Sequence, residues 1–230
     1  MFGFSFKAKA KEPAKEKRQF FTHDNVAFHR IELRSKFPES KSDSAVLSSR
    51  SYSKFTRENP PKRVVAFGLG GTLLDYEKSQ EKNQLHLFLE EEIKEFLATV
   101  DKDTMVIILT SRSVANEGKR LNCLSVDRIL DHFGKKYFDA VFFTNGEEEH
   151  NHKKVSNKYL VFDYLYQYYD KQPAKDHFVL IDDVNFHLRE CVDHGFRAIS
   201  SNTKEKSYFP ELKEIIQETV TPSVGVTKTR

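Results

Sequence analysis

Tryptophan is absent from the 230-residue sequence, which has only two cysteines and two methionines and no long apolar run. A helix that spans a bilayer needs about 20 consecutive apolar residues, so we expect no membrane span. Residues 1–18 (MFGFSFKAKAKEPAKEKR) lack an apolar segment with a small-residue cleavage site, so we expect no secretory signal. Cys123 and Cys191 form neither a CxxC pair nor a disulfide framework. This indicates a reducing compartment and a cytoplasmic protein.

An excess of one charge is also absent overall, because 37 Lys or Arg face 34 Asp or Glu. Along the chain the balance changes: residues 1–63 carry 15 basic against 7 acidic residues, and the remainder carries 22 against 27. The composition of residues 1–61 predicts a basic, largely disordered arm with a Ser-rich linker over residues 35–53. A solvated tail and an arm that contacts an acidic protein partner both fit this composition. Arginine clusters interleaved with aromatic residues are weak here, so we expect no nucleic-acid partner.

From residue 62 onward, short apolar runs alternate with helical patterns. Five nearly continuous runs predict buried strands: residues 64–67, 105–109, 140–143, 178–181 and 196–199. Apolar residues at helical spacing predict helices over 85–100, 158–169 and 187–194. This alternation predicts an α/β domain over residues 62–212, followed by a tail over 213–230. The predicted core is a Rossmann-like parallel sheet of about five strands, in which ligands bind at the carboxyl ends of the strands.

Four of these strand ends carry polar residues or glycine. The first is followed by residues 68–73 (GLGGTL), and the second ends at Thr110. The third continues into residues 144–146 (TNG), with Lys158 at the start of the next helical pattern, and the fourth ends in residues 182–183 (DD). Because these ends meet at one edge of a parallel sheet, we expect them to form one site.

This order of strand ends resembles the haloacid dehalogenase-like (HAD) superfamily, whose members are mostly Mg²⁺-dependent phosphohydrolases. The resemblance covers about residues 63–200 and implies a Rossmann-like HAD core. The segment between Asp75 and Thr104 has room for one helix and a flap, so we expect a minimal cap or none. Residues 142–191 also resemble a little-characterised branch found in intracellular bacterial pathogens. That finer resemblance, if it holds, implies export into a host cell without a cleaved signal.

The first strand end departs from the family pattern, which reads Asp-x-Asp-Gly-Thr-Leu. In the family the first Asp attacks phosphorus and the second moves protons. Aligning residues 71–73 (GTL) with the end of that motif puts Gly68 at the nucleophile position and Gly70 at the acid/base position. Glycine has no side chain for either task, so we expect no intact catalytic residue.

The resemblance assigns roles to the rest of the site. Four residues are expected to bind phosphate: Thr110, Lys158, Gly71 and Thr72. Lys153 and Lys154 stay open as alternatives to Lys158. Asp182 and Asp183 are expected to hold Mg²⁺, but weakly, because the nucleophilic carboxylate that would share the metal is missing.

Three functions follow. The leading hypothesis is a HAD-like pseudophosphatase that acts as a binding or interaction protein for a phosphate-bearing ligand or a partner. The second is a working Mg²⁺-dependent phosphohydrolase that forms an aspartyl-phosphate in its active form; Asp75, as a replacement nucleophile, lies past the strand end. The third is a nucleotide-binding protein that uses the turn at residues 68–71. Ser111 and Arg112 fit either a phosphate contact or a loop, and His187 and His194 are expected to face solvent or pack along a helix.

Overall fold

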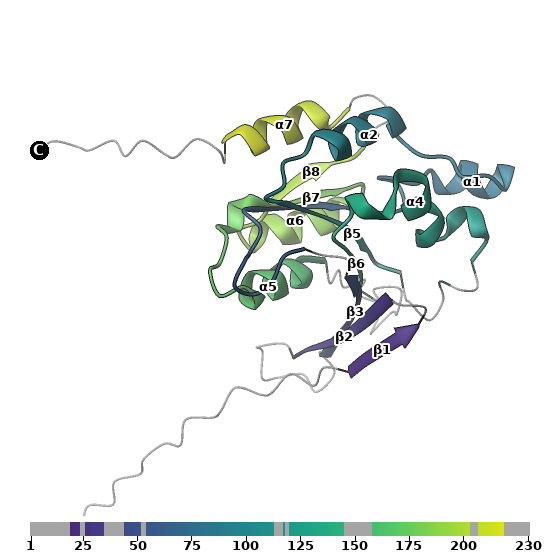
Figure 1. Cartoon of the computed structure of the whole chain (residues 1–230). Coiled ribbons are helices and arrows are strands. Elements are labelled where there is room, and N and C mark those ends of the chain that lie inside the picture. The colour runs from purple at the N-terminus through teal and green to yellow at the C-terminus, as the bar shows by residue number, and fades with distance from the viewer. Residues whose placement is uncertain are drawn as a thin grey trace, which may run out of the picture.

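A computed structural model describes residues 19–23, 26–34, 44–51, 54–112, 117, 120–144, 158–202 and 207–218. An eight-stranded sheet runs through the molecule in the order β1-β2-β3-β6-β5-β4-β7-β8 (Figure 1). Its strands are β1 (Gln19–His23), β2 (Val26–Arg34), β3 (Ser44–Ser51), β4 (Arg63–Phe67), β5 (Thr104–Thr110), β6 (Ala140–Phe143), β7 (Phe178–Asp182) and β8 (Arg197–Ser200).

The five strands from β4 to β8 are parallel to one another. They match the five predicted runs closely, so the predicted Rossmann-like α/β core is confirmed. The strand order within the core is β6-β5-β4-β7-β8. The chain adds β5 and β6 on one side of β4 and then β7 and β8 on the other, so β4 is the point where the strand order reverses. In such sheets the reversal point opens a crevice at the carboxyl ends of the strands, which is where ligands bind.

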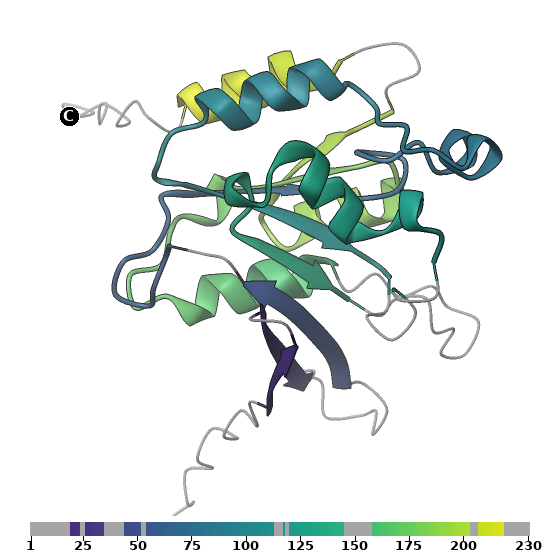
Figure 2. The same cartoon turned by 45° about the vertical axis from the view of Figure 1, so that its right-hand side comes forward.

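Helices cover both faces of the parallel strands. The described helices are α1 (Tyr76–Lys82), α2 (Glu90–Thr99), α4 (Val126–Phe133), α5 (Lys158–Tyr168), α6 (Asn185–Asp193) and α7 (Phe209–Glu218), and all but α1 contribute apolar side chains to the core. The apolar side chains of α2, α4 and α7 pack on one face, and those of α5 and α6 pack on the other. In Figure 2, α2 and α7 lie side by side above the sheet and α5 lies below it. The result is a three-layer α/β/α arrangement.

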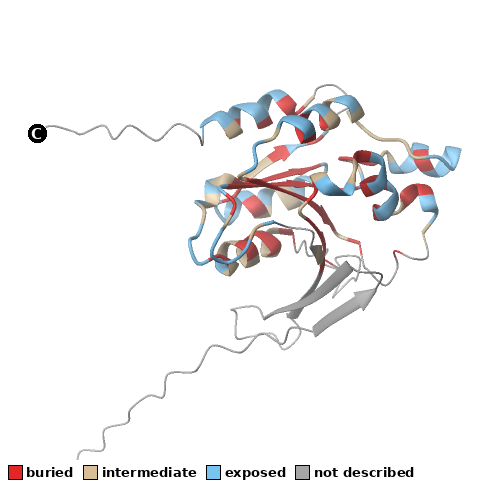
Figure 3. Cartoon of the chain, viewed as in Figure 1, coloured by how far each residue is buried: buried red, intermediate tan, exposed pale blue. Residues whose placement is uncertain are grey.

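Alternation along β4 shows why the sheet is buried on both faces. Val65 and Phe67 join the core under α2, α4 and α7, whereas Val64 and Ala66 join the core over α5 and α6. All four are fully buried, as are the neighbouring strands in Figure 3. A strand covered on both sides has no polar face, which explains the continuous apolar runs in the sequence.

The N-terminal part differs from the expected disordered arm, because three strands form within residues 19–51. They pair antiparallel, and β3 adds to the parallel core by pairing with β6. The Ser-rich composition of β3 gives no apolar strand pattern in the sequence. The strand forms nevertheless, because strand pairing uses backbone groups and tolerates serine side chains. Arg50 of β3 also forms a 2.6 Å ion pair with Asp127 of α4 and lies over the Phe143 ring. These contacts fix β3 to the core.

The C-terminal boundary also lies further on than expected. Residue 212 falls inside α7, and Leu212 and Ile215 of that helix are buried against the core. Only α1 and residues 83–89 lie between Asp75 and α2, in keeping with a minimal cap. Within the described part of the chain, no helix is both long and apolar enough to cross a membrane.

Candidate functional site

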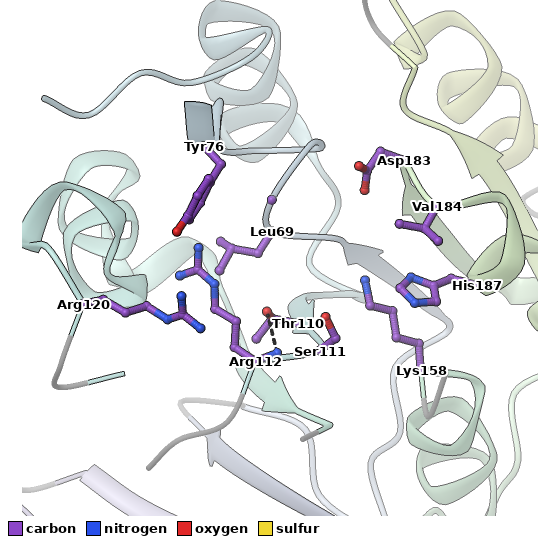
Figure 4. Close-up of a pocket in the computed structure, with 11 residues that line it drawn as sticks. Leu69, Tyr76, Thr110, Ser111, Arg112, Arg120, Lys158, Asp183, Val184 and His187 are labelled. Atoms are coloured by element: carbon purple, nitrogen blue, oxygen red, sulfur yellow. Dashed lines mark hydrogen bonds between the residues drawn. The ribbon is translucent and has the colours of Figure 1, made fainter. Parts of the chain in front are cut away.

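A cavity of about 280 Å³ opens at the carboxyl edge of the sheet, between the ends of β4, β5 and β7 and the start of α5 (Figure 4). Its lining comes from every strand end that the sequence singled out except that of β6. The residues are Leu69, Gly70, Tyr76, Thr110, Ser111, Arg112, Arg120, Lys158, Asp183, Val184 and His187. The predicted convergence of strand ends is therefore present in the fold.

Asp182 lies behind one end of the cavity as a fully buried carboxylate. Its Oδ2 accepts a hydrogen bond from the Lys158 ammonium, which is also buried. Its Oδ1 pairs with Nδ1 of His187 at 3.0 Å and accepts the Val184 backbone N–H at 3.0 Å. A carboxylate can only accept, so Nδ1 of His187 carries the proton in this arrangement. One buried carboxylate thus orients two groups, Lys158 and His187, that face the cavity.

The pKa values of the two neighbouring carboxyl groups, Asp182 and Asp183, are shifted in opposite directions. Burial raises the pKa of Asp182, but the Lys158 charge and the His187 hydrogen bond outweigh it and hold the pKa at about 2. Burial and the adjacent Asp182 charge raise the pKa of Asp183 above its usual value. Asp182 is therefore ionised at neutral pH, which keeps the buried ion pair intact.

A second buried carboxylate, Glu117, holds the opposite end of the cavity. Its Oε1 lies 3.5 Å from Nη1 of Arg112, and its Oε2 lies 3.5 Å from Nε of Arg120. Oε1 also accepts the Val126 backbone N–H at 2.8 Å, at the start of α4. Arg112 is buried and donates at 2.6 Å to the Leu124 carbonyl. Arg112 is therefore tied to the framework by hydrogen bonds, whereas Arg120 is within ion-pair distance of the same carboxylate. Figure 4 shows both guanidinium groups on the Tyr76 side of the cavity.

The glycine turn after β4 leaves unequal room at its three glycines. A Cβ on Gly68 would lie 2.8 Å from Oδ2 of Asp182 and 2.9 Å from Oγ1 of Thr72. A Cβ on Gly70 would meet nothing within 4 Å. Gly71 has φ +77° and would clash with the Asp183 carboxylate. The expected nucleophile position is thus tightly enclosed, whereas the expected acid/base position opens onto the cavity.

The four predicted phosphate-binding residues separate into two groups. Thr110 and Lys158 line the cavity. Gly71 and Thr72 are not part of the lining: the Gly71 N–H donates to the Leu74 carbonyl at 3.0 Å, and Oγ1 of Thr72 pairs with Ser201 at 2.8 Å. Lys153 and Lys154 lie outside the described residues.

Asp75 has a structural role. Its side chain accepts the Lys78 N–H at 3.1 Å as the N-cap of α1. It is not a lining residue, which separates it from the site. Because α1 begins only at Tyr76, its N-terminus does not directly follow the turn at residues 68–71, as a dinucleotide-binding turn requires.

The described residues do not fit a Mg²⁺ site. Both Asp182 oxygens are engaged by Lys158, His187 and the Val184 N–H, which leaves Asp183 as the carboxylate among the lining residues. Gly68 supplies no ligand. Among the residues that the structure describes, no three His, Cys, Asp or Glu side chains gather as a metal site would require.

No protein-family model and no curated protein matches this chain. Among solved structures, it is similar to a predicted HAD-like family hydrolase from Porphyromonas gingivalis, at 12% identity and a TM-score of 0.42. That match covers 67% of this chain and 98% of the other. A second similar structure is an uncharacterized protein from Corynebacterium glutamicum ATCC 13032 Kitasato, at 15% identity and a TM-score of 0.39. It covers 70% of this chain and 97% of the other.

Sequence reasoning missed three parts of the site. His187 was expected to face solvent or pack along a helix, yet it contacts Asp182 from the first turn of α6. A signal was present, because a residue three positions into a helix can reach back to the strand end before it. Glu117 and Arg120 lie on no predicted strand or helix, although they are near neighbours of Arg112 in the sequence and form ion pairs with one another there. His194 stacks on Tyr159 with ring centroids 4.0 Å apart, in line with a packing role.

Proposed function

We propose that this chain is a HAD-like pseudophosphatase: a phosphatase-type scaffold that does not hydrolyse phosphate esters and instead binds a phosphate-bearing ligand. The observation that carries the proposal is the chemistry at the end of β4. The alignment with the family motif puts Gly68 and Gly70 at the two positions where the family mechanism needs carboxylates, and Asp75 is used as a helix cap. Without a nucleophile there, an aspartyl-phosphate has nowhere to form.

The ion pair between Lys158 and Asp182 supports the same proposal. In the family mechanism, a Lys stabilises the transferring phosphoryl group and the acidic pair shares a metal with the nucleophile. Here Lys158 and Asp182 satisfy each other, and both are buried. The charges of Lys158 and Asp182 therefore neutralise each other without a divalent cation. This favours a site that binds a ligand over a metal-dependent catalytic site.

Binding of phosphate is supported by the groups that line the cavity. Among the described residues of the lining, Arg112, Arg120 and Lys158 are cationic and Asp183 is acidic. The carboxylates of Glu117 and Asp182 lie behind these cations and are buried, so an anion in the cavity meets the cations first. Any acidic partner of the basic N-terminal residues stays a prediction of the sequence.

The first test measures hydrolysis of para-nitrophenyl phosphate with excess Mg²⁺. We expect no turnover by the wild-type chain and measurable turnover by the Gly68→Asp/Gly70→Asp variant, with Gly70→Asp alone as the matched control that lacks a nucleophile. Thermal melting must accompany the assay, because the new Asp at 68 displaces the Asp182 carboxylate. Wild-type turnover that Asp182→Asn abolishes would refute the pseudophosphatase. Calorimetry with orthophosphate tests binding separately, and the absence of binding would refute that half of the proposal.

A further inference from the structure

His187 brings an imidazole nucleophile to the cavity. It lines the cavity from the first turn of α6, and its Nδ1 pairs with Oδ1 of Asp182 at 3.0 Å. A neutral imidazole carries a proton on one ring nitrogen and a lone pair on the other. Because the Asp182 carboxylate can only accept a hydrogen bond, the lone pair of neutral His187 lies on Nε2. The buried carboxylate therefore fixes both the tautomer and the orientation of the ring, as an activated nucleophile requires.

Nε2 of His187 is open to the cavity. Within the described part of the chain this nitrogen makes no hydrogen bond, and it is not among the described polar atoms that are buried without a partner. An atom with neither property is in contact with solvent. Since the His187 side chain is 14% exposed and lines the cavity, Nε2 is reached through the cavity. Figure 4 shows the ring beside the end of the Lys158 side chain.

The charges around this ring suit a phosphoryl group. Asp182 holds Lys158 through one oxygen and His187 through the other, so the ammonium and the imidazole lie next to each other. Lys158 is part of the lining and the Asp182 carboxylate is not, so a group on Nε2 meets the positive charge first, and the ammonium keeps its partner. The first turn of α6 adds the positive end of a helix dipole, which stabilises negative charge.

From this geometry we propose that His187 accepts a phosphoryl group at Nε2 from an acyl phosphate. In this step a bond forms between Nε2 and phosphorus, and the bond between phosphorus and the acyl oxygen breaks. The electron pair of the broken bond leaves with that oxygen, and the donor departs as a carboxylate. The Nδ1 proton stays on the ring and keeps its hydrogen bond to Asp182. The proposal rests on the proposed function, because the donor is a phosphate-bearing ligand of the same cavity.

The class of donor follows from the leaving group. An alkoxide that leaves a phosphate ester needs a proton from a general acid, and the alignment with the family motif puts Gly70 at that position. A carboxylate leaves an acyl phosphate without taking up a proton. The cavity, at about 280 Å³, is at the small end of the range of about 300–1,000 Å³ that is usual for ligand pockets, which favours a small donor such as acetyl phosphate. This transfer differs from the ester hydrolysis that the proposed function excludes.

Mass spectrometry of the intact full chain tests the proposal, after incubation with acetyl phosphate in buffer with a chelator. The added mass distinguishes a phosphoryl group from an acetyl group on a lysine. We expect one phosphoryl group that is lost in acid and is stable in alkali, as is typical of phosphohistidine. The native chain should acquire it faster than the urea-unfolded chain, because only the fold holds His187 against Asp182 and beside Lys158.

His187→Asn is the variant that tests the acceptor atom. The Asn amide keeps an N–H donor for Asp182 and removes Nε2, so we expect the label to be lost. His194→Asn is the matched control on the same side of the sheet. His194 stacks on Tyr159 and is not a lining residue, so its replacement should leave the label unchanged. Melting curves of both variants exclude loss of folding as the cause.

The alternative results are separable. Equal labelling of His187→Asn and the wild-type chain would overturn the proposal, and so would equal rates for the native and unfolded chains. A label that alkali removes and Asp183→Asn abolishes would identify an aspartyl-phosphate instead and would also overturn it. An unlabelled wild-type chain that binds orthophosphate in calorimetry would refute the phosphohistidine and leave the proposed function standing; without orthophosphate binding, both fail. A labelled chain that also hydrolyses para-nitrophenyl phosphate would refute the proposed function alone.

Discussion

Replacing Asp182 with Asn tests the buried ion pair on which the site depends. Asp182 is fully buried and Lys158 is 4% exposed, so the variant leaves an ammonium in the interior without its carboxylate. The amide also offers N–H donors where Lys158 and His187 donate. Removal of one partner of a buried pair costs about 3–5 kcal/mol. We therefore expect the free energy of unfolding at pH 7 to fall by about that amount.

The same carboxylate predicts a pH dependence. Its pKa is about 2 in the folded chain against the usual 3.8, because Lys158 and His187 outweigh the effect of burial. A lowered folded pKa adds stability that is fully present above pH 3.8 and is lost as the pH falls toward 2. The difference corresponds to roughly 2 kcal/mol. Between pH 5 and pH 2 the wild-type chain should lose about that much more stability than Asp182→Asn, which cannot titrate.

Urea unfolding followed by far-ultraviolet circular dichroism measures both effects, since the chain has no tryptophan to report by fluorescence. Asp170→Asn is the matched control. Asp170 pairs with Arg57 at 3.1 Å, but both side chains are more than half exposed, so its loss should cost less than about 1 kcal/mol. Equal small losses in the two variants would refute our account of the buried pair.

Two other predictions concern the turn and the cysteines. Gly71→Ala places a Cβ on a residue with φ +77° and against Asp183, so it should lower the free energy of unfolding by about 1–3 kcal/mol. Gly70→Ala is the control and should cost little, because nothing lies within 4 Å of its Cβ. Similar urea midpoints for the two variants would contradict this. Cys123 and Cys191 are buried, and burial raises the pKa of Cys191 to about 12. A thiol reagent should therefore react with neither until urea unfolds the chain, and rapid labelling of the native protein would be inconsistent with that burial.

The parallel core was predictable because each strand is buried on both faces and so appears as an apolar run. Residues 64–67 and 178–181 fall within β4 and β7 almost to the residue. The N-terminal strands were not predictable by the same reasoning. β3 spans Ser44–Ser51, whose serines are typical of linkers, and it forms a strand by pairing with β2 and β6. Its stability comes from partners distant in the sequence, which a local pattern does not report.

The candidate site divides along similar lines. Thr110 and Lys158 were predictable because they lie at strand ends or helix starts, and parallel strands bring those ends together. The metal-binding role expected of Asp182 did not anticipate that Lys158 and His187 would engage both of its oxygens. Spacing fixes which element a residue lies on. Spacing does not determine which neighbouring side chains a carboxylate such as Asp182 pairs with.

The pairing of Asp182 with Lys158 predicts how the chain responds to Mg²⁺. In the wild-type chain Lys158 already neutralises Asp182, so excess MgCl₂ should leave the melting temperature unchanged. The Gly68→Asp/Gly70→Asp variant adds two carboxylates beside Asp182 and Asp183 and should melt lower without metal, because like charges then crowd one edge of the sheet. A divalent cation that binds this variant, at a concentration of about a hundred times its dissociation constant, would raise the free energy of unfolding by about 2.7 kcal/mol. Gly70→Asp alone should gain less, because it lacks the ligand at 68. An equal rise for the wild-type chain would show that Asp182 exchanges Lys158 for a metal, and the buried ion pair would then be only one of two states of the site.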